Sequence, residues 1–265
     1  MHAFEYHRPS GVKDATALGE KKSEGKYLAG GQSLVQAMKL RLSSPTDLID
    51  LNAIGDLKTL KAEGSGVTVG AMVRHAEVAA SSAVQKAIPA LAALAGIIGD
   101  RQVRHMGTIG GSIANNDPAA DYPAAVLGLG ATITTNKRKI EADGFFKGLY
   151  ETALAPGELV TSVSFPAPKR AAYMKFKNPA SRFAIVGVFV ADFGGKVRVA
   201  VTGAGPSVFR QAEMEKALSA KFAPESVASI KVKPQGLNND LHASPEYRAH
   251  LVTVMAKRAV EAALK

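Results

Sequence analysis

The chain has 265 residues, of which 46% are hydrophobic and 21% charged, so it has the composition of a folded globular protein rather than a disordered one. It contains no cysteine, which excludes disulfides, thiolate-bound zinc, cysteine-ligated iron–sulfur clusters and a cysteinyl-linked cofactor in this chain. The formal net charge is +10, but the basic residues are dispersed and lack interleaved aromatics. We therefore expect a solvated basic surface or an acidic protein partner, and no nucleic acid.

The length predicts two or three subdomains. No apolar run reaches the 18 or so residues that a membrane span needs, so we expect no membrane span. The first residues lack the basic-then-apolar layout of a secretory signal, and we expect a cytoplasmic location.

The first candidate site is a strand, glycine turn and helix. An apolar segment at 26–29 ends at Gly30 and Gly31, and Ser33 is placed to cap a helix that runs to about Leu42. The helix is expected to pack through its apolar stripe, Leu34, Val35, Met38 and Leu42. Amide groups at its start can hold an anion such as a pyrophosphate, or the turn can simply let strand and helix pack. The residues alone leave both open.

The next segments predict strands at 47–51 and 66–70 and helices at 73–80 and 89–98, the last one buried. Residues 107–121 follow as a predicted ligand loop. Its three glycines permit positive φ and close approach of a ligand, and short polar side chains follow them. The alternative is a plain turn before a helix that Asp121 caps.

Beyond this stretch we expect a helix at 123–129 and strands at 131–135, 139–141 and 158–165, with the aromatic cluster at 144–152 as a core anchor. Pro166 and Pro168 suggest a domain boundary. Three antiparallel strands at 173–177, 183–193 and 196–202 should follow, the last two joined at Gly194 and Gly195. Helices at 210–220 and 245–265 should cover this sheet, the second through Tyr247, Leu251, Val254 and Arg258.

Catalytic motifs are lacking in the sequence. The six histidines form no two-histidine metal spacing with nearby carboxylates, so we expect no metal site. No serine occupies a Gly-x-Ser-x-Gly elbow, which argues against a hydrolase. His105, beside the glycine-rich stretch, is expected at the surface. Two glycine-rich turns remain, and together they can hold one extended, phosphate-bearing cofactor.

Four motifs carry a family resemblance: Ala-Gly-Gly-Gln-Ser-Leu at 29–34, Met-Lys-Leu-Arg-Leu at 38–42, Gln-Val-Arg at 102–104 leading into Gly-Thr-Ile-Gly-Gly at 107–111, and Asp-Pro-Ala-Ala-Asp at 117–121. With them, nearly the whole chain resembles the FAD-binding medium subunit of molybdenum hydroxylases. The likeness is greatest to the carbon monoxide dehydrogenase medium-subunit type within the xanthine dehydrogenase family.

The resemblance implies an α+β chain with two parts. The first, residues 1–168, would be a two-subdomain FAD-binding module of the vanillyl-alcohol oxidase type (PCMH-like), with subdomains at about 1–55 and 56–168. The second, residues 169–265, would be a small C-terminal domain with the three-stranded antiparallel sheet and helices.

The resemblance also implies the cofactor contacts. The pyrophosphate would lie on the first segment, Ala29, Gly30, Gly31, Gln32 and Ser33, with Leu34 completing it. The second side of the cofactor would be wrapped by Thr108, Gly110, Gly111 and Ser112, with Asn115 and Asp121 as polar contacts. Nearer the flavin ring would lie Ile97, Ile98, a backbone contact at Leu159 or Val160, and Lys177, for which Lys175 is the competing assignment.

In function, the resemblance implies an oxidoreductase subunit that binds FAD without any catalytic residue of its own. Molybdopterin would be held by a large subunit and two 2Fe-2S clusters by a small subunit, in a dimer of heterotrimers. Electrons would pass from the clusters through FAD to an external acceptor. The alternatives are a self-sufficient FAD oxidoreductase and a non-redox scaffold that keeps the fold.

Overall fold

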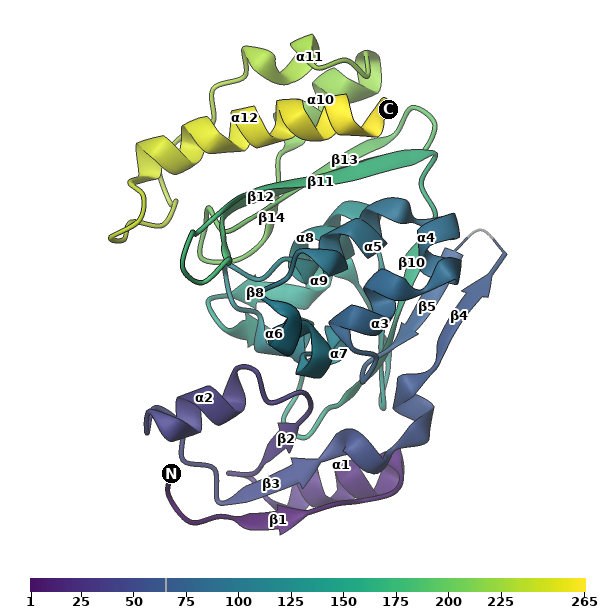
Figure 1. Cartoon of the computed structure of the whole chain (residues 1–265), viewed down its shortest axis with the longest axis vertical. Coiled ribbons are helices and arrows are strands. Elements are labelled where there is room, and N and C mark those ends of the chain that lie inside the picture. Colours follow the sequence, from purple (N-terminus) through teal and green to yellow (C-terminus); the bar gives the residue numbers. More distant parts are fainter. Residues whose placement is uncertain (65) are drawn as a thin grey trace.

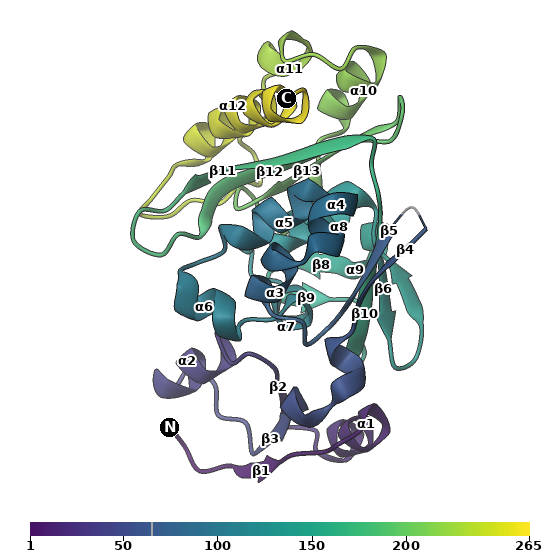
Figure 2. The same ribbon diagram turned by 45° about the vertical axis from the view of Figure 1, so that its right-hand side comes forward.

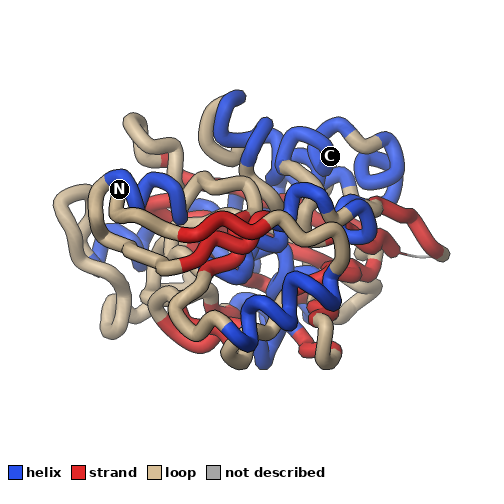
Figure 3. Tube along the Cα trace, turned by 90° about the horizontal axis from the view of Figure 1, so that it is seen from below, coloured by secondary structure: helices blue, strands red, loops and turns tan. Residues whose placement is uncertain are grey.

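The computed structural model describes residues 1–64 and 66–265, and it stacks an N-terminal lobe, a central layer and a C-terminal layer along its long axis (Figure 1). The N-terminal lobe is a parallel sheet of order β1-β3-β2, made of β1 (Glu5–His7), β3 (Asp47–Asp50) and β2 (Lys26–Leu28). It also contains α1 (Val12–Lys21), α2 (Leu34–Lys39), η1 (Leu51–Ala53) and η2 (Gly55–Lys58). Seen from below, the three strands cross the molecule with the amino terminus beside a helix (Figure 3).

The central layer is built on an antiparallel sheet of order β4-β5-β10-β6-β7. Its strands are β4 (Leu60–Glu63), β5 (Gly66–Gly70), β10 (Val160–Pro166), β6 (Thr132–Thr135) and β7 (Lys139–Glu141). Beside it lie α3 (His75–Ala80), α4 (Ser82–Ala87), α5 (Pro89–Gly96), α6 (Arg101–Met106), α7 (Ile109–Asn115), α8 (Tyr122–Leu129), α9 (Ala142–Phe145), β8 (Phe146–Gly148) and β9 (Glu151–Thr152). Figure 2 shows α3, α5 and α8 between this sheet and the C-terminal sheet.

The C-terminal layer is an antiparallel sheet of order β11-β12-β13-β14, with helices on its outer face. Its elements are β11 (Arg170–Lys177), β12 (Ala184–Asp192), β13 (Val197–Thr202), β14 (Phe209–Arg210), α10 (Ala212–Ala220), α11 (Glu225–Ala228) and α12 (Pro245–Ala263). One face packs on α10 and α12, and the other on α5 and α8. Every residue of β12 is buried because the strand is covered on both faces.

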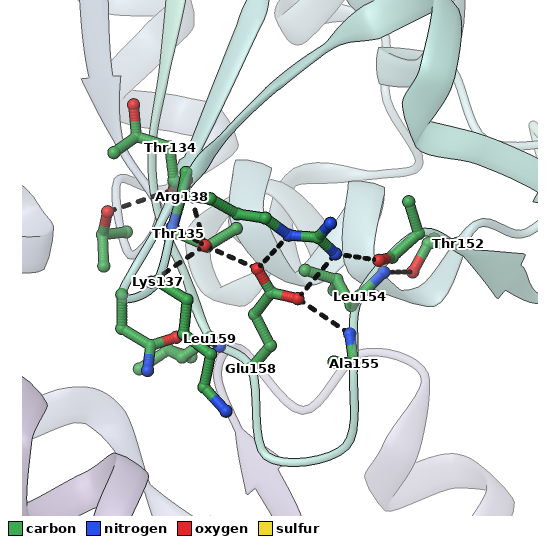
Figure 4. Close-up of polar contacts among 12 residues, drawn as sticks. Thr134, Thr135, Lys137, Arg138, Thr152, Leu154, Ala155, Glu158 and Leu159 are labelled. Carbon is green, nitrogen blue, oxygen red and sulfur yellow. Dashed lines mark hydrogen bonds and ion pairs between the residues drawn. The ribbon is translucent and has the colours of Figure 1, made fainter.

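Glu158 fastens the chain just before β10 to the β6–β7 hairpin (Figure 4). Its carboxylate accepts hydrogen bonds from Thr135 Oγ1 at 2.7 Å, from Arg138 Nε at 3.0 Å and from the Ala155 amide at 2.8 Å. The side chain of Glu158 is only 1% exposed, and the guanidinium of Arg138 holds its pKa down at about 2. A buried carboxylate thus keeps its charge through direct pairing.

Most predicted strands are confirmed, including those at 47–50 and 66–70 and the hairpin through Gly194 and Gly195. The C-terminal sheet has four strands rather than the three expected, since β14 adds two residues that are too few to give a sequence pattern. Leu149 and Tyr150 are 60% and 59% exposed, so only Phe145 is a fully buried anchor in that cluster.

Two helices also differ from expectation. In α12 the predicted stripe is confirmed only in part. Leu251 is buried and Val254 packs against the same core, whereas Tyr247 is 43% exposed and Arg258 is exposed. The rest of the contact with the sheet comes from residues that include Val252, Met255 and Ala259. Helix α2 ends at Lys39 rather than near Leu42, and Ser33 makes no side-chain capping bond. Within the described ranges, no helix is both long and apolar enough to cross a membrane.

The predicted ligand loop at 107–121 is wrong in its first half, which forms α7. Thr108 caps this helix by accepting the Gly111 amide on Oγ1 at 3.2 Å. Gly107, Gly110 and Gly111 do not have positive φ, whereas Asn116 does, at 44°. Gly110 is required for close packing within the chain, because a Cβ there would lie 2.7 Å from the Ala71 carbonyl oxygen.

Candidate cofactor site

The two glycine segments, residues 29–34 and 107–112, lie in direct contact. A Cβ on Gly30 would overlap the carbonyl oxygen of Met106 and lie 2.7 Å from Gly107 Cα. A Cβ on Gly111 would lie 3.4 Å from Ala29 Cβ. The chain therefore brings together the two segments predicted to share a ligand, and glycine is needed at Gly30 for them to meet.

The first segment offers a run of available amide groups. Among the described residues, the backbone N–H groups of Gly30, Gly31, Gln32, Ser33 and Leu34 have no protein acceptor. Gly31 has a φ of 72°, which turns the backbone between β2 and α2. Successive unpaired amides at such a turn form a concave site for an anion.

The second segment has its amides already engaged. Gly110 donates to the Ala71 carbonyl at 2.9 Å, Ile109 to Val73 at 3.2 Å, and Ser112 to Thr108 at 3.0 Å. Thr108 is buried, while Ser112 and Asn115 are half-buried with side chains that bond to no other described group. This segment therefore forms a wall and presents side chains, whereas the first segment presents backbone donors.

Asp121 lies in a buried ion pair and does not cap α8. It accepts the Tyr173 hydroxyl at 2.6 Å and the Lys175 ammonium at 3.0 Å, and the side chains of Asp121 and Lys175 are each 3% exposed. Burial raises the pKa of Asp121, and the nearby Lys175 opposes that rise. The residue joins α8 to β11 and is not an exposed polar contact.

The turn after α5 carries Ile97 and Ile98. Ile97 is 45% exposed, and its carbonyl accepts the Lys175 ammonium at 3.1 Å. Arg104 Nη1 donates to the carbonyls of Ile98 at 3.0 Å and Gly99 at 3.1 Å. Sequence analysis named Arg104 only as part of the motif at 102–104 and did not predict these hydrogen bonds to the turn.

The two lysines left open by the sequence lie in different surroundings. Lys177 is exposed at the end of β11, while Lys175 has its ammonium against Ile97 and Asp121. Of the two, Lys175 is the one that the structure brings to the Ile97 turn.

Leu159 and Val160 are buried, at 5% and 3% exposure. Leu159 packs in the core of the N-terminal lobe, against which Ala29 also packs. Its amide donates to Asn136 Oδ1 at 2.8 Å, and its carbonyl accepts the Asn136 amide at 3.0 Å. Both backbone groups are engaged, so Leu159 stands behind the first segment as support.

His75 and Tyr122 lie under the start of the second segment. The His75 amide donates to the Gly107 carbonyl at 2.9 Å, and a Cβ on Gly107 would lie 2.5 Å from His75 Nε2. The His75 and Tyr122 rings lie 5.2 Å apart, and burial lowers the pKa of His75 to about 4. Sequence analysis did not single out either residue. His105, by contrast, is exposed.

One group of metal-ligating atoms occurs among the described residues, away from the glycine segments. Glu5, His7 and Asp47 place one ligand atom each within 4.8 Å of one another. The Lys22 ammonium lies 3.0 Å from Asp47 Oδ1 and 3.4 Å from Glu5 Oε2. An ammonium in this position makes the group an ion-pair network on β1 and β3.

Comparison with known proteins identifies the family of this chain. Residues 2–168 match the family described as FAD binding domain in molybdopterin dehydrogenase, and residues 171–263 match the CO dehydrogenase flavoprotein C-terminal domain. The chain is 36% identical to the carbon monoxide dehydrogenase medium chain of Hydrogenophaga pseudoflava, over 98% of this chain and 96% of that one. It is 34% identical to the nicotine 6-hydroxylase medium subunit of Paenarthrobacter nicotinovorans, over 98% and 97%.

Solved structures give the same result. Reconstituted CO dehydrogenase from Oligotropha carboxidovorans matches with a TM-score of 0.92 and 33% identity, covering 99% of this chain and 98% of that one. Quinoline 2-oxidoreductase from Pseudomonas putida 86 matches with a TM-score of 0.90 and 26% identity, covering 99% and 97%. The chain belongs to the family of FAD-binding subunits of molybdenum-containing oxidoreductases. Its mixed helix and sheet fold, an FAD-binding domain followed by a C-terminal domain, is that of the carbon monoxide dehydrogenase type.

Proposed function

We propose that this chain is the FAD-carrying medium subunit of a heterotrimeric molybdenum hydroxylase. The observation that carries the proposal is the contact between residues 29–34 and 107–112, with unpaired amides on the first segment. A diphosphate needs several donors in a small space, and consecutive amides at a glycine turn supply them. The free amides of this chain thus fit the group that its family binds.

In this proposal, Ala29 to Leu34 hold the pyrophosphate, with Gly30 and Gly31 allowing its approach. Thr108, Gly110 and Gly111 form the opposite wall, while Ser112 and Asn115 offer the side chains that remain free. Ile97 and Ile98 lie toward the flavin ring. Of the two competing lysines we choose Lys175 over Lys177, since the Lys175 ammonium donates to the Ile97 carbonyl at 3.1 Å.

Asp121, Leu159 and Val160 then act as support, because their polar groups or side chains are buried within the chain. The Lys175 ammonium is balanced by the Asp121 carboxylate, so its part in the site is to hold the Ile97 turn in place through the bond to the Ile97 carbonyl. When bound, FAD supplies a carrier that accepts electrons from the partners' clusters and delivers them to an external acceptor.

We assign the other cofactors to partner chains. This chain has no cysteine to ligate a cluster, so we place the two 2Fe-2S clusters in a small subunit. From the family resemblance we place molybdopterin in a large subunit and the three chains in a dimer of heterotrimers. We also propose a division of the chain into a PCMH-type module at 1–168, with subdomains at about 1–55 and 56–168, and a C-terminal domain at 169–265.

The test is Gly30→Ala against Gly55→Ala. The added methyl at Gly30 would overlap the Met106 carbonyl, whereas a Cβ at Gly55 has no neighbour within 4 Å. We expect at least a tenfold loss of FAD affinity, measured by titration of visible flavin absorbance, for the first variant alone. A wild-type chain that holds no flavin, even when co-produced with its partner subunits, would refute the proposal.

A further inference from the structure

The turn that ends α2, residues 40–42, exposes two leucines. Leu40 is 70% exposed and Leu42 is 78% exposed. The turn is ordered by its backbone, since Leu40 donates to the Gln36 carbonyl at 3.0 Å, Arg41 to Met38 at 3.1 Å and Leu42 to Ala37 at 2.8 Å. The leucines are therefore presented to solvent by a closed hydrogen-bonded turn.

Arg41 has a φ of 58° at the centre of this turn. The hydrogen bonds follow the pattern in which the residue after a helix adopts a left-handed conformation, a position that strongly favours glycine. An arginine there carries a backbone strain that glycine would not. The hydrophobic contact that usually closes this motif is weak here, since Leu42 faces solvent.

The surroundings of the turn are basic and apolar. Lys39 and Arg41 are exposed, and neither has an ion pair within the described part of the chain. The amino terminus lies beside α2 in both labelled views (Figures 1 and 2), and its first residues include Met1 and Phe4, which are 51% and 38% exposed. An apolar surface with unpaired cations at its edge fits a partner with carboxylates around an apolar depression.

We propose that residues 39–42 dock this chain onto an acidic, apolar surface of another subunit of the same complex. The proposal rests on the proposed function for the existence of that subunit. A second copy of this chain is a poor occupant, because it would bring the same cations and the chain carries a net charge of +10. A lipid surface is also a poor occupant, because α2 has six residues and buries only Met38 as a helix face.

The experiment compares Leu40→Ser combined with Leu42→Ser, Arg41→Gly, and the control Leu241→Ser. Leu241 is fully exposed in the segment between α11 and α12 of the C-terminal layer, which makes it a matched exposed leucine outside the N-terminal lobe. Each full-length chain is co-produced with the iron–sulfur and molybdopterin subunits, and assembly is measured by sedimentation. FAD content and melting temperature are measured on each medium subunit separately.

We expect the double leucine variant to assemble at least tenfold more weakly while it keeps wild-type FAD content. Arg41→Gly should also weaken assembly, yet raise the melting temperature, since glycine relieves the strained φ. A purely structural role for Arg41 would leave assembly unchanged in that variant. The control should match wild type in every measurement.

Three outcomes overturn the proposal. The first is a double leucine variant that assembles like Leu241→Ser, which leaves the proposed function standing. The second is a double leucine variant that assembles normally but no longer forms dimers of the isolated chain, which assigns the turn to a second copy, or no longer binds phosphatidylglycerol vesicles, which assigns it to lipid. The third is a wild-type chain that binds no FAD and does not assemble, in which case the proposed function fails together with the docking surface.

Discussion

Lys175 and Asp121 form an ion pair of 3.0 Å in which both side chains are 3% exposed, and the pair joins β11 of the C-terminal sheet to the start of α8. The Tyr173 hydroxyl completes the carboxylate's hydrogen bonds at 2.6 Å. Buried pairs of this kind add little net stability, but removing one partner leaves an uncompensated charge. We therefore expect the protein to be destabilised more by replacing one partner of this pair than by replacing both with apolar residues.

Lys175→Met should therefore destabilise the chain by about 3–5 kcal/mol, since Asp121 stays buried without its counter-ion. Lys177→Met is the matched control, two residues along the same strand and exposed, and should cost less than about 0.5 kcal/mol. Urea unfolding of the two variants measures the difference. Equal effects would show that the Lys175 ammonium is not buried as described.

Glu158→Gln should lower the free energy of unfolding by about 2 kcal/mol, because Gln cannot accept all the hydrogen bonds that the Glu158 carboxylate accepts (Figure 4). The half-exposed Arg138 can reach solvent, which limits the loss. The pKa of Glu158 is lowered to about 2, so the stabilisation is present above the ordinary value of 4.5 and is lost as the pH falls toward 2. The difference in free energy of unfolding between wild type and Glu158→Gln should be smaller at pH 3.5 than at pH 7. Glu261→Gln, a substitution at an exposed position, should match wild type at both pH values.

His75 should make the chain less stable in mild acid. Burial lowers its pKa from 6.5 to about 4, so between these values the unfolded chain binds a proton that the folded chain does not. The free energy of unfolding is therefore unaffected by His75 above pH 6.5 and falls by about 3 kcal/mol as the pH drops to 4. His75→Gln should flatten this slope, whereas His105→Gln, at an exposed position, should keep it. Parallel slopes for all three chains would contradict the prediction.

Gly110→Ala should cost about 1–3 kcal/mol, because the added methyl would lie 2.7 Å from the Ala71 carbonyl oxygen and 2.8 Å from its Cα, neither of which can move freely. Gly144→Ala, with no atom within 4 Å of the new Cβ, should be neutral or slightly stabilising. Thermal unfolding of the two variants is the measurement. A stable Gly110→Ala chain would mean that α7 can shift away from Ala71.

The sequence predicted the strands and hairpins of this fold well, because alternating residues and turn glycines are local signals. It failed for α7, where Gly110 and Gly111 suggest a loop although Thr108 caps a helix whose glycines serve packing against Ala71. It also failed for Asp121, whose position before Pro123 suggests a cap. The partners that bury this carboxylate lie more than fifty residues away, on β11.

The candidate site was predictable in its segments but less so in the tasks of its residues. Both glycine motifs were identified, and their contact is consistent with a shared ligand. The second segment has no free amides at Gly110 and Ile109, because these donate to Ala71 and Val73. The spacing of residues in the sequence does not reveal such hydrogen bonds. The choice between Lys175 and Lys177 likewise depends on which of them faces Ile97.

The four-stranded C-terminal sheet has a consequence for exchanging parts between relatives. Phe189 of β12 belongs to the same core as α5 and α8, and it packs on Gly128 so closely that a Cβ there would lie 2.9 Å from its ring. A hybrid that joins the first 168 residues of this chain to the C-terminal part of a relative would therefore need a matching small residue and ring at these two positions. The two regions recognised as separate families are, in this chain, halves of one interlocked unit that must vary together.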